Sequence, residues 1–336
     1  MRHRLLKVLL VLLTVLLLLP TALVLLAYRP DLSRERLEET YYTAESHYAT
    51  VTVDDLDGNP VEIDLHYRDV GGPDDPVVVL LHGMFSSLGT FDAWIVELLA
   101  SGYRVVAVDL PNHGLSGGFS DGAGSRRRSA AAVKGILDLL GVETCVLAGN
   151  SMGGGVAWEL AGAHHGVDGF AVAGLVLIDA VHPDLGSGAP EGAEGLRSHP
   201  RLAGFLSHLT PRFLLKRILG DVYGSASMLT EGILDRYYDL LRKDGNREAV
   251  LLTHPEEEPD GSARLDAIRD AGIPVLVLWG EEDSWIDAAF AEAFATSLDL
   301  AADRVIVYPG LGHVPMEEDP AATAADLLTF LGELPF

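Results

Sequence analysis

The segment Cys145-Val-Leu-Ala-Gly-Asn-Ser-Met-Gly-Gly-Gly-Val156 begins as an apolar run and then becomes glycine-rich. Its centre places Ser151 between Gly149 and Gly153, in the pattern Gly-x-Ser-x-Gly. This spacing predicts a buried strand that turns sharply into a helix, with the serine at the apex of the turn. The glycines allow neighbouring backbone to approach closely, so the serine hydroxyl is lifted clear of the sheet. A glycine-rich turn with an incidental serine is the competing interpretation.

The bulk composition limits the class of protein. The chain has 336 residues, enough for one large α/β domain or two modest ones. Its 49 acidic and 24 basic residues give a net charge of −25, which argues against a nucleic-acid partner. The single cysteine, Cys145, excludes an intramolecular disulfide and a multi-cysteine metal site. No Walker-type loop or Gly-x-Gly-x-x-Gly fingerprint is present, so no nucleotide cofactor is expected.

The amino-terminal residues 1–28 contain an uncharged, leucine-rich run over 8–28. As a helix this run would span about 30 Å, enough to cross a bilayer core. We therefore expect an uncleaved single-pass membrane anchor with the lipid bilayer as its partner, and the positive-inside count slightly favours an extracytoplasmic main domain. A cleavable signal peptide is the alternative, because it also starts with basic residues. Residues 29–46 are expected to form a tether or a short helix.

From residue 47 onwards, strand-like apolar runs alternate with helical spacing. The expected strands are 47–54, 61–70, 77–81, 103–110, 143–149, 174–179, 274–279 and 304–308. The expected helices between and after them are 91–101, 125–140, 152–164, 287–298 and 320–331. Strands separated by helices imply an α/β fold with a mostly parallel, eight-stranded sheet and helices on both faces.

The interval 182–272 interrupts this alternation because it has no convincing β pattern. Helical spacing at 200–219 and 230–243, followed by a polar, proline-containing loop at 251–263, predicts a helical cap over the carboxyl edge of the sheet. The expected domains are an anchor at 1–28, a tether at 29–46, an α/β core at 47–181 and 273–336, and the cap at 182–272.

Two strand ends carry residues that could serve Ser151. A serine nucleophile needs a base within hydrogen-bond reach and an acid that orients the base. Asp283 follows one predicted strand in Gly-Glu-Glu-Asp, and His313 follows the last strand in Gly-Leu-Gly-His. We expect Ser151, Asp283 and His313 to be the catalytic residues. Four other carboxylates could orient the base in place of Asp283: Glu281, Glu282, Asp287 and Asp179.

Two loops after strands have supporting roles. The backbone amides of Met84, in His82-Gly-Met, and of Met152, directly after the nucleophile, are expected to form an oxyanion hole. Asp109 and His113 lie in Asp-Leu-Pro-Asn-His-Gly, where no third metal ligand is in view. We therefore expect these two side chains to hydrogen-bond across their loop, and we expect neither a metal nor an organic cofactor.

Taken in order, these motifs resemble the α/β-hydrolase superfamily in its cap-bearing branch, over residues 47–333. The resemblance rests on His82-Gly-Met, Asp109-Leu-Pro-Asn-His-Gly, Gly149-Asn-Ser-Met-Gly, Gly280-Glu-Glu-Asp and Gly312-His. It implies Ser151 as nucleophile, Asp283 as acid and His313 as base. Serine at the elbow speaks against epoxide hydrolases and haloalkane dehalogenases, which have aspartate there. Carbon–carbon bond hydrolases of aromatic degradation share Gly-Asn-Ser-Met-Gly-Gly, and cofactor-free haloperoxidases share a close variant, so the motif secures neither subfamily.

The sequence thus predicts a membrane-anchored serine hydrolase that cleaves a carboxylic ester or related small acyl substrate through an acyl-enzyme on Ser151. The alternatives are a carbon–carbon bond hydrolase, an amidase or peptidase of the same fold, and a non-catalytic binding protein. Apolar cap side chains are expected to build the acyl pocket, namely Phe205, Leu206, Phe213, Leu214, Tyr237 and Tyr238.

Overall fold

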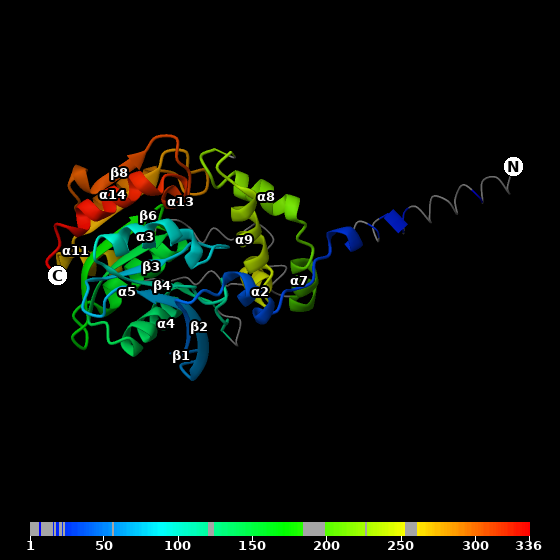
Figure 1. Cartoon of the computed structure of the whole chain (residues 1–336), viewed down its shortest axis with the longest axis horizontal. Coiled ribbons are helices and arrows are strands. Elements are labelled where there is room, and N and C mark those ends of the chain that lie inside the picture. The colour runs from blue at the N-terminus through cyan, green and yellow to red at the C-terminus, as the bar shows by residue number, and fades with distance from the viewer. Residues whose placement is uncertain are drawn as a thin grey trace.

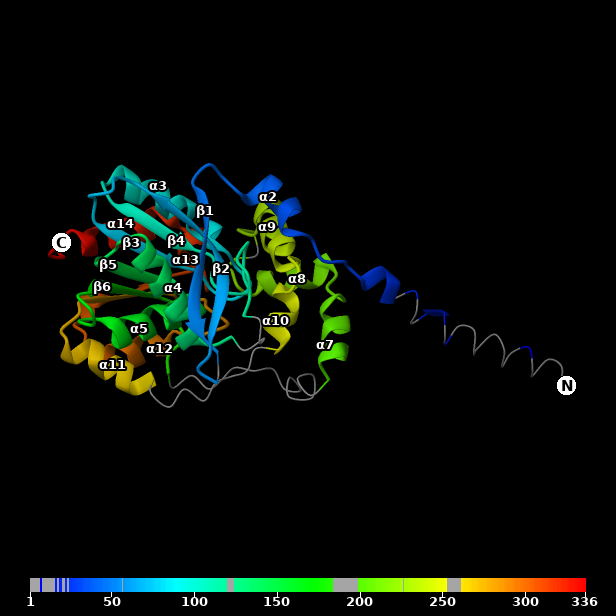
Figure 2. The same ribbon diagram turned by 90° about the horizontal axis from the view of Figure 1, so that it is seen from below.

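The computed structural model describes residues 24–336 except 56, 120–123, 184–198, 226 and 253–260, together with residues 7, 16, 18, 19 and 22. One sheet forms the centre of the molecule, with helices on both of its faces (Figure 1). A separate group of helices lies at one end of the sheet, on the side from which the amino-terminal segment extends (Figures 1 and 2).

The sheet has eight strands in the order β1-β2-β4-β3-β5-β6-β7-β8. β1 pairs antiparallel with β2, and β2 antiparallel with β4, whereas all other neighbours are parallel. The predicted mostly parallel sheet is therefore confirmed, with each strand within a few residues of its expected position. The strand bounds are β1 Ser46–Asp54, β2 Pro60–Val70, β3 Val77–Leu81, β4 Arg104–Val108, β5 Thr144–Asn150, β6 Ala171–Ile178, β7 Val275–Gly280 and β8 Val305–Tyr308.

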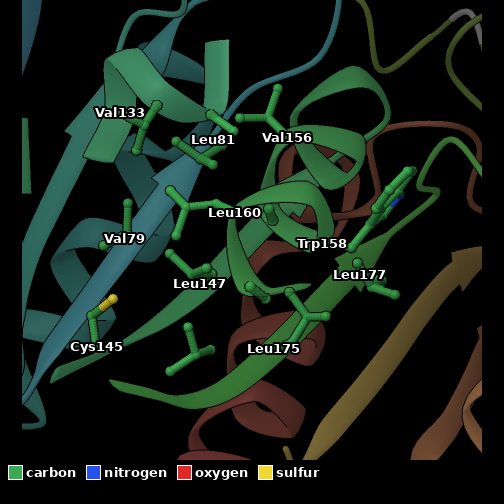
Figure 3. Packing of buried hydrophobic residues seen from close by; sticks show 14 of the residues in the cluster. Val79, Leu81, Val133, Cys145, Leu147, Val156, Trp158, Leu160, Leu175 and Leu177 are labelled. Atoms are coloured by element: carbon green, nitrogen blue, oxygen red, sulfur yellow. The ribbon is translucent and has the colours of Figure 1, made fainter. Parts of the chain in front are cut away.

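The central strands are continuous apolar runs because both faces of the sheet are covered. Every residue of β3 is buried, with Val79 and Leu81 packed on one face and Val78 and Leu80 on the other. Figure 3 shows the first of these two layers, in which Cys145 packs among aliphatic side chains. Each fully buried aliphatic side chain of this kind contributes about 2 kcal/mol. Burial also raises the pKa of the Cys145 thiol to about 12, so this cysteine is a packing residue.

Helices cover the sheet in two layers that follow the same division (Figure 2). One face carries α4 Arg126–Leu139, α5 Met152–His164, α11 Gly261–Asp270 and α12 Ala289–Leu298. The other face carries α3 Asp92–Ala100, α13 Pro315–Glu318 and α14 Pro320–Leu331. The 3-10 turn η1 Leu88–Phe91 directly precedes α3. A second 3-10 turn, η2 Ala302–Arg304, leads into β8.

The cap helices are α7 Pro200–Ser207, α8 Arg212–Gly220, α9 Glu231–Leu241 and α10 Asn246–Leu252. The helical stretch expected at 200–219 is broken into two, because Pro211 lacks an amide hydrogen and disfavours helical backbone in the residue before it. The loop expected at 251–263 overlaps the end of α10 and the start of α11, two helices that were not predicted. α11 packs on α5, where Gly162 abuts the backbone of Arg264 and the Arg264 side chain pairs with Glu159 at 3.0 Å.

The segment expected as a tether is attached to the cap. Arg29 N donates to His208 O and Leu32 N donates to Arg242 O, both at 2.8 Å. The helix α2 Arg34–Tyr41 follows, capped by the side chain of Ser33. Its buried Leu37 packs with Leu115 of the core and Leu240 of the cap, so this segment bridges the two.

The predicted localisation in a membrane needs correction. Most of residues 1–28 lie outside the described residues. Within the described part of the chain, no helix has the length and apolar character that crossing a membrane requires. The helical residues before Tyr28 end where Arg29-Pro30 turns the backbone towards the cap. The expected single-pass anchor, and with it a bilayer partner bound through an amino-terminal helix, is not supported by the described residues.

Candidate active site

The strand-to-helix turn between β5 and α5 has the geometry that the Gly-x-Ser-x-Gly pattern predicts. Ser151 has φ 54° and ψ −118°, a strained conformation for a residue with a side chain. A Cβ atom on Gly149 would lie 2.2 Å from Gly153 O, and one on Gly153 would lie 2.2 Å from Leu81 O. Both flanking positions therefore require glycine. The elbow holds Ser151 at the carboxyl edge of the sheet, at the amino terminus of α5.

At the ends of two other strands, Asp283 and His313 are joined by a hydrogen bond. His313 Nδ1 lies 2.7 Å from Asp283 Oδ2, and both side chains are buried. The second oxygen, Asp283 Oδ1, accepts from the amides of Trp285 at 2.8 Å and Ile286 at 3.0 Å. These bonds fix the position of the carboxylate, which in turn orients the imidazole and fixes its tautomer.

The backbone of His313 is held from both sides. Its amide donates to Val222 O of the cap at 2.8 Å. Its carbonyl accepts from Asn150 Nδ2 at 2.9 Å, and Asn150 immediately precedes Ser151. The serine turn and the histidine loop are thus tied directly together. The sequence analysis missed this role of Asn150, because nothing in the elbow motif indicates a partner 163 residues away.

The loop with Met84 lies directly over the serine. A Cβ atom on Gly83 would be 3.1 Å from Ser151 Cβ, so glycine is needed for this close approach. Met152 is the first residue of α5, and its amide therefore has no partner within the helix. Both amides expected to form the oxyanion hole thus belong to backbone next to Ser151.

His82 fixes the shape of this loop. Its Nε2 accepts from the Leu110 amide at 3.0 Å, so its Nδ1 carries the hydrogen and donates to Gly83 O at 2.7 Å. Burial lowers the pKa of His82, which keeps the ring neutral and this arrangement intact. His82 is therefore a structural residue of this loop.

A small cavity lies between the Met84 loop, the histidine loop and the cap. Its volume is about 20 Å³, room for about one water molecule. The core contributes Met84, Asn150 and His313 to its lining, and the cap contributes Leu219, Val222 and Tyr237. A larger open groove of about 400 Å³ lies by the opposite end of β7, near Arg269 and Arg304, far from the chemistry of the strand ends. No hydrogen bond joins Ser151 Oγ to His313 among the described residues; such catalytic bonds often form only with substrate.

Of the competing carboxylates, Asp179 alone comes close to His313. One oxygen of each of Asp179 and Asp283 and one nitrogen of His313 lie within 4.8 Å of one another. Asp179 Oδ1 accepts from the Gly280 amide at 2.9 Å, and its Oδ2 has no hydrogen-bond partner. Burial and the charge of Asp283 raise the pKa of Asp179 well above its ordinary value. Asp283, not Asp179, is the carboxylate that hydrogen-bonds the imidazole.

The other competing carboxylates point elsewhere. Glu281 and Glu282 are exposed, and Asp287 Oδ1 accepts from the Ala289 amide at the start of α12. A metal bound by Asp179, Asp283 and His313 would need the imidazole nitrogen that already hydrogen-bonds Asp283. The donor set therefore fits proton transfer better than metal binding.

Asp109 and His113 both make hydrogen bonds across their loop, as predicted, but not with each other. Asp109 Oδ2 instead bonds His66 Nδ1 of β2 at 2.7 Å, and its two oxygens also accept from the amides of Leu88 and Leu115. His113 bonds Pro111 O within its own loop at 2.9 Å, where the turn at Asn112 has φ 65°. Although burial alone would raise it, the hydrogen bond and charge of His66 hold the pKa of Asp109 at about 2.

The cap residues expected to line an acyl pocket divide into two groups. Tyr237 lines the cavity and Tyr238 is buried. The other four side chains lie on the outside of α7 and α8, with exposed fractions from 36% to 75%: Phe205, Leu206, Phe213 and Leu214. Helical periodicity did not show which face of these helices is turned inward. Leu219 and Val222 line the cavity in place of these four side chains.

Comparison with known proteins agrees with the fold. The profile of the alpha/beta hydrolase family matches residues 78–326, so the chain belongs to this family. A 2-hydroxy-6-oxononadienedioate/2-hydroxy-6-oxononatrienedioate hydrolase of Paraburkholderia phymatum is 31% identical over 299 residues, which cover 86% of this chain and 96% of the relative.

Two solved structures show the same likeness. A thermophilic esterase of Thermogutta terrifontis has a TM-score of 0.68 and 25% identity, over 85% of this chain and 98% of its own. A membrane phospholipase A has a TM-score of 0.60 and 25% identity, over 99% of this chain and 98% of its own. A hydrolase with a small-molecule substrate is consistent with all three proteins.

Proposed function

We propose that this chain is a serine hydrolase that cleaves a carboxylic ester, with Ser151 as nucleophile, His313 as base and Asp283 as acid. The observation that carries the proposal is the strained serine turn tied through Asn150 to a histidine that hydrogen-bonds a buried, amide-supported carboxylate. Backbone strain at Ser151 and a buried hydrogen bond between a histidine and a carboxylate, brought together at one edge of the sheet, point to chemistry.

The proposed reaction has two halves. Ser151 Oγ attacks the ester carbonyl while His313 Nε2 takes its proton, and Asp283 stabilises the imidazolium that results. The amides of Met84 and Met152 stabilise the oxyanion. His313 then gives the proton to the leaving alcohol, which departs and leaves an acyl group on Ser151. In the second half, His313 activates water, which releases the acid and restores the serine.

A carbon–carbon bond hydrolase is the second candidate, because the Paraburkholderia relative is named for this type of substrate. Its dienedioate substrate carries two carboxylates, which a binding site would pair with cations or several hydrogen-bond donors. Among the described residues that line the cavity there is no arginine or lysine, and most of the lining is apolar or aromatic. This lining favours a neutral acyl substrate over a dianion. The esterase of Thermogutta terrifontis supports the same choice.

The test is a comparison of substrates on the full-length chain. A fluorophosphonate probe should label Ser151, and p-nitrophenyl esters of increasing acyl length should be hydrolysed with a higher kcat/KM than 2-hydroxy-6-oxononadienedioate. The matched control is Ser151→Ala, which removes only the hydroxyl and should abolish both labelling and turnover.

Preferred turnover of the dienedioate would move the proposal to carbon–carbon cleavage. Amide substrates cleaved faster than esters would move it to an amidase. Absence of both labelling and turnover on any substrate in the wild-type chain would remove the catalytic proposal and leave a binding protein on this fold.

A further inference from the structure

The cavity next to the serine turn lies between the core and the cap. Its volume of about 20 Å³ is too small for an ester with even a short acyl chain. Leu219, Val222 and Tyr237 form its cap side. Substrate entry therefore requires these side chains to move, although the amide of His313 is bonded to the carbonyl of Val222. Movement of the cap and the position of His313 are consequently linked.

One carboxylate lies at this junction. Glu318, the last residue of α13, accepts from the Gly312 amide through Oε1 at 2.9 Å. Its other oxygen, Oε2, accepts from the Gly224 amide at 2.8 Å. Gly312 immediately precedes His313, and Gly224 belongs to the cap segment 222–224. Glu318 thus bridges the histidine loop and the cap through two charge-assisted hydrogen bonds.

The two backbones are in direct contact at this point, so the bridge has little freedom. A Cβ atom on Gly224 would lie 2.3 Å from Gly310 O, and one on Gly312 would lie 2.3 Å from Gly224 N. Both positions therefore require glycine. Tyr223, between Val222 and Gly224, adds a bond from its hydroxyl to Glu317 Oε2 at 2.5 Å.

We propose that Glu318 is a positioning residue: by binding the Gly224 and Gly312 amides together, it holds the cap segment 222–224 against the histidine loop and so sets the alignment of His313. This inference rests on the proposed esterase function. Glu318 contacts neither substrate nor Ser151, so its effect on catalysis passes through the backbone of His313. Closure of the cap and alignment of the base then occur together, which keeps the serine inactive while the cap is displaced.

The main test is Glu318→Gln. The amide oxygen of glutamine can accept one of the two bonds, but its NH₂ group then faces the other backbone N–H, donor against donor. We expect kcat per active site, counted by fluorophosphonate titration, to fall about 100-fold, the size of effect that a small misplacement of a catalytic group produces. KM should change by less than about threefold, because no substrate contact is removed. The charge-matched control is Glu292→Gln on the exposed side of α12, which should leave kcat unchanged.

A second variant approaches the same junction from the cap. Gly224→Ala introduces a Cβ atom that must push the segment 222–224 away from Gly310. We expect the same fall in kcat at similar KM, and the double variant with Glu318→Gln should lose little more than either single one, because both break one bridge. The proton resonance of the hydrogen bond between His313 and Asp283 should shift in both variants, whereas destabilisation of the fold elsewhere would leave it in place.

The possible results are distinguishable. If Glu318→Gln retains kcat per titrated site within about twofold of the wild type, or if the two variants have fully additive effects, Glu318 does not position His313. If the wild-type chain itself hydrolyses no ester, the proposed function fails instead, and the resonance of His313 still reports whether the bridge positions the imidazole. Should Gly224→Ala not fold, Glu318→Gln alone decides, since it adds no bulk.

Discussion

The ends of β6 and β7 carry two buried aspartates with different surroundings. Asp283 accepts from two backbone amides and from His313, so all of its negative charge is met by donors. Asp179 has one amide partner at Gly280, an unpartnered second oxygen, and Asp283 as a neighbour. Burial and that neighbouring charge raise the pKa of Asp179. The number of hydrogen-bond donors, rather than depth of burial, distinguishes the carboxylate that orients the imidazole.

The largest effect should follow from Asp283→Asn. Asparagine can still accept from the Trp285 and Ile286 amides, so folding should persist, but its NH₂ group would stabilise the wrong tautomer of His313. We expect kcat for a p-nitrophenyl ester to fall about 10⁴-fold, measured per folded molecule with circular dichroism as the folding control. A loss of less than tenfold would transfer the acid role to Asp179 and reverse the comparison.

A third strand-end aspartate, Asp109, extends the comparison to stability. Its pKa is depressed to about 2. Its charge therefore stabilises the fold at pH values above its ordinary pKa of 3.8, and this contribution is lost as the pH falls towards 2. Asp109→Asn should therefore lower the free energy of unfolding by about 3 kcal/mol at pH 7, as expected when one partner of a buried, hydrogen-bonded pair is replaced. Urea unfolding at pH 7 and pH 3 should show the difference shrinking at the lower pH. An equal loss at both pH values would show that the charge is not the cause.

Asp179→Asn should have the smallest effect of the three substitutions, and it should raise the stability of the fold rather than lower it. A raised pKa means that the folded chain keeps a proton that the unfolded chain has lost, so the stability present below pH 3.8 declines as the pH rises. Asparagine can accept from Gly280 and donate towards Asp283 without this cost. We expect a gain of about 1 kcal/mol at pH 8, no gain near pH 3, and kcat within about tenfold of the wild type. Destabilisation at pH 8 would show that Asp179 is ionised in the folded chain.

The sequence was sufficient where local pattern determines structure. The buried run of β3 and the glycines around Ser151 constrain the backbone within a few residues, so their conformation follows from neighbouring positions. The strand ends of Asp283 and His313 were placed at one edge because parallel strands share it. Contacts between distant segments could not be read in this way. The pairing of Asp109 with His66, and the bonds of Glu318 to Gly224 and Gly312, depend on which loops the fold brings together.

Three further errors arose from reading local patterns. α11 was not predicted because its start adjoins a polar, proline-containing stretch that gives a loop pattern. The outward-facing side chains of α7 and α8 were expected to point inward, because apolar spacing identifies an apolar face but not what covers it. The apolar amino terminus was likewise assigned a role from composition alone.

The contact between the cap segment 222–224 and the histidine loop limits how caps can be exchanged within this family. Because main-chain atoms meet at Gly224 and Gly312 without intervening side chains, a cap transplanted from a relative must reproduce a backbone path, not merely a matching set of side chains. Chimeras whose crossover points fall outside this segment keep the recipient's own contact between residues 222–224 and the histidine loop. Chimeras with a crossover inside this segment place the donor's backbone beside the recipient's catalytic histidine. Cap exchange meant to change substrate range should therefore leave residues 222–224 unaltered.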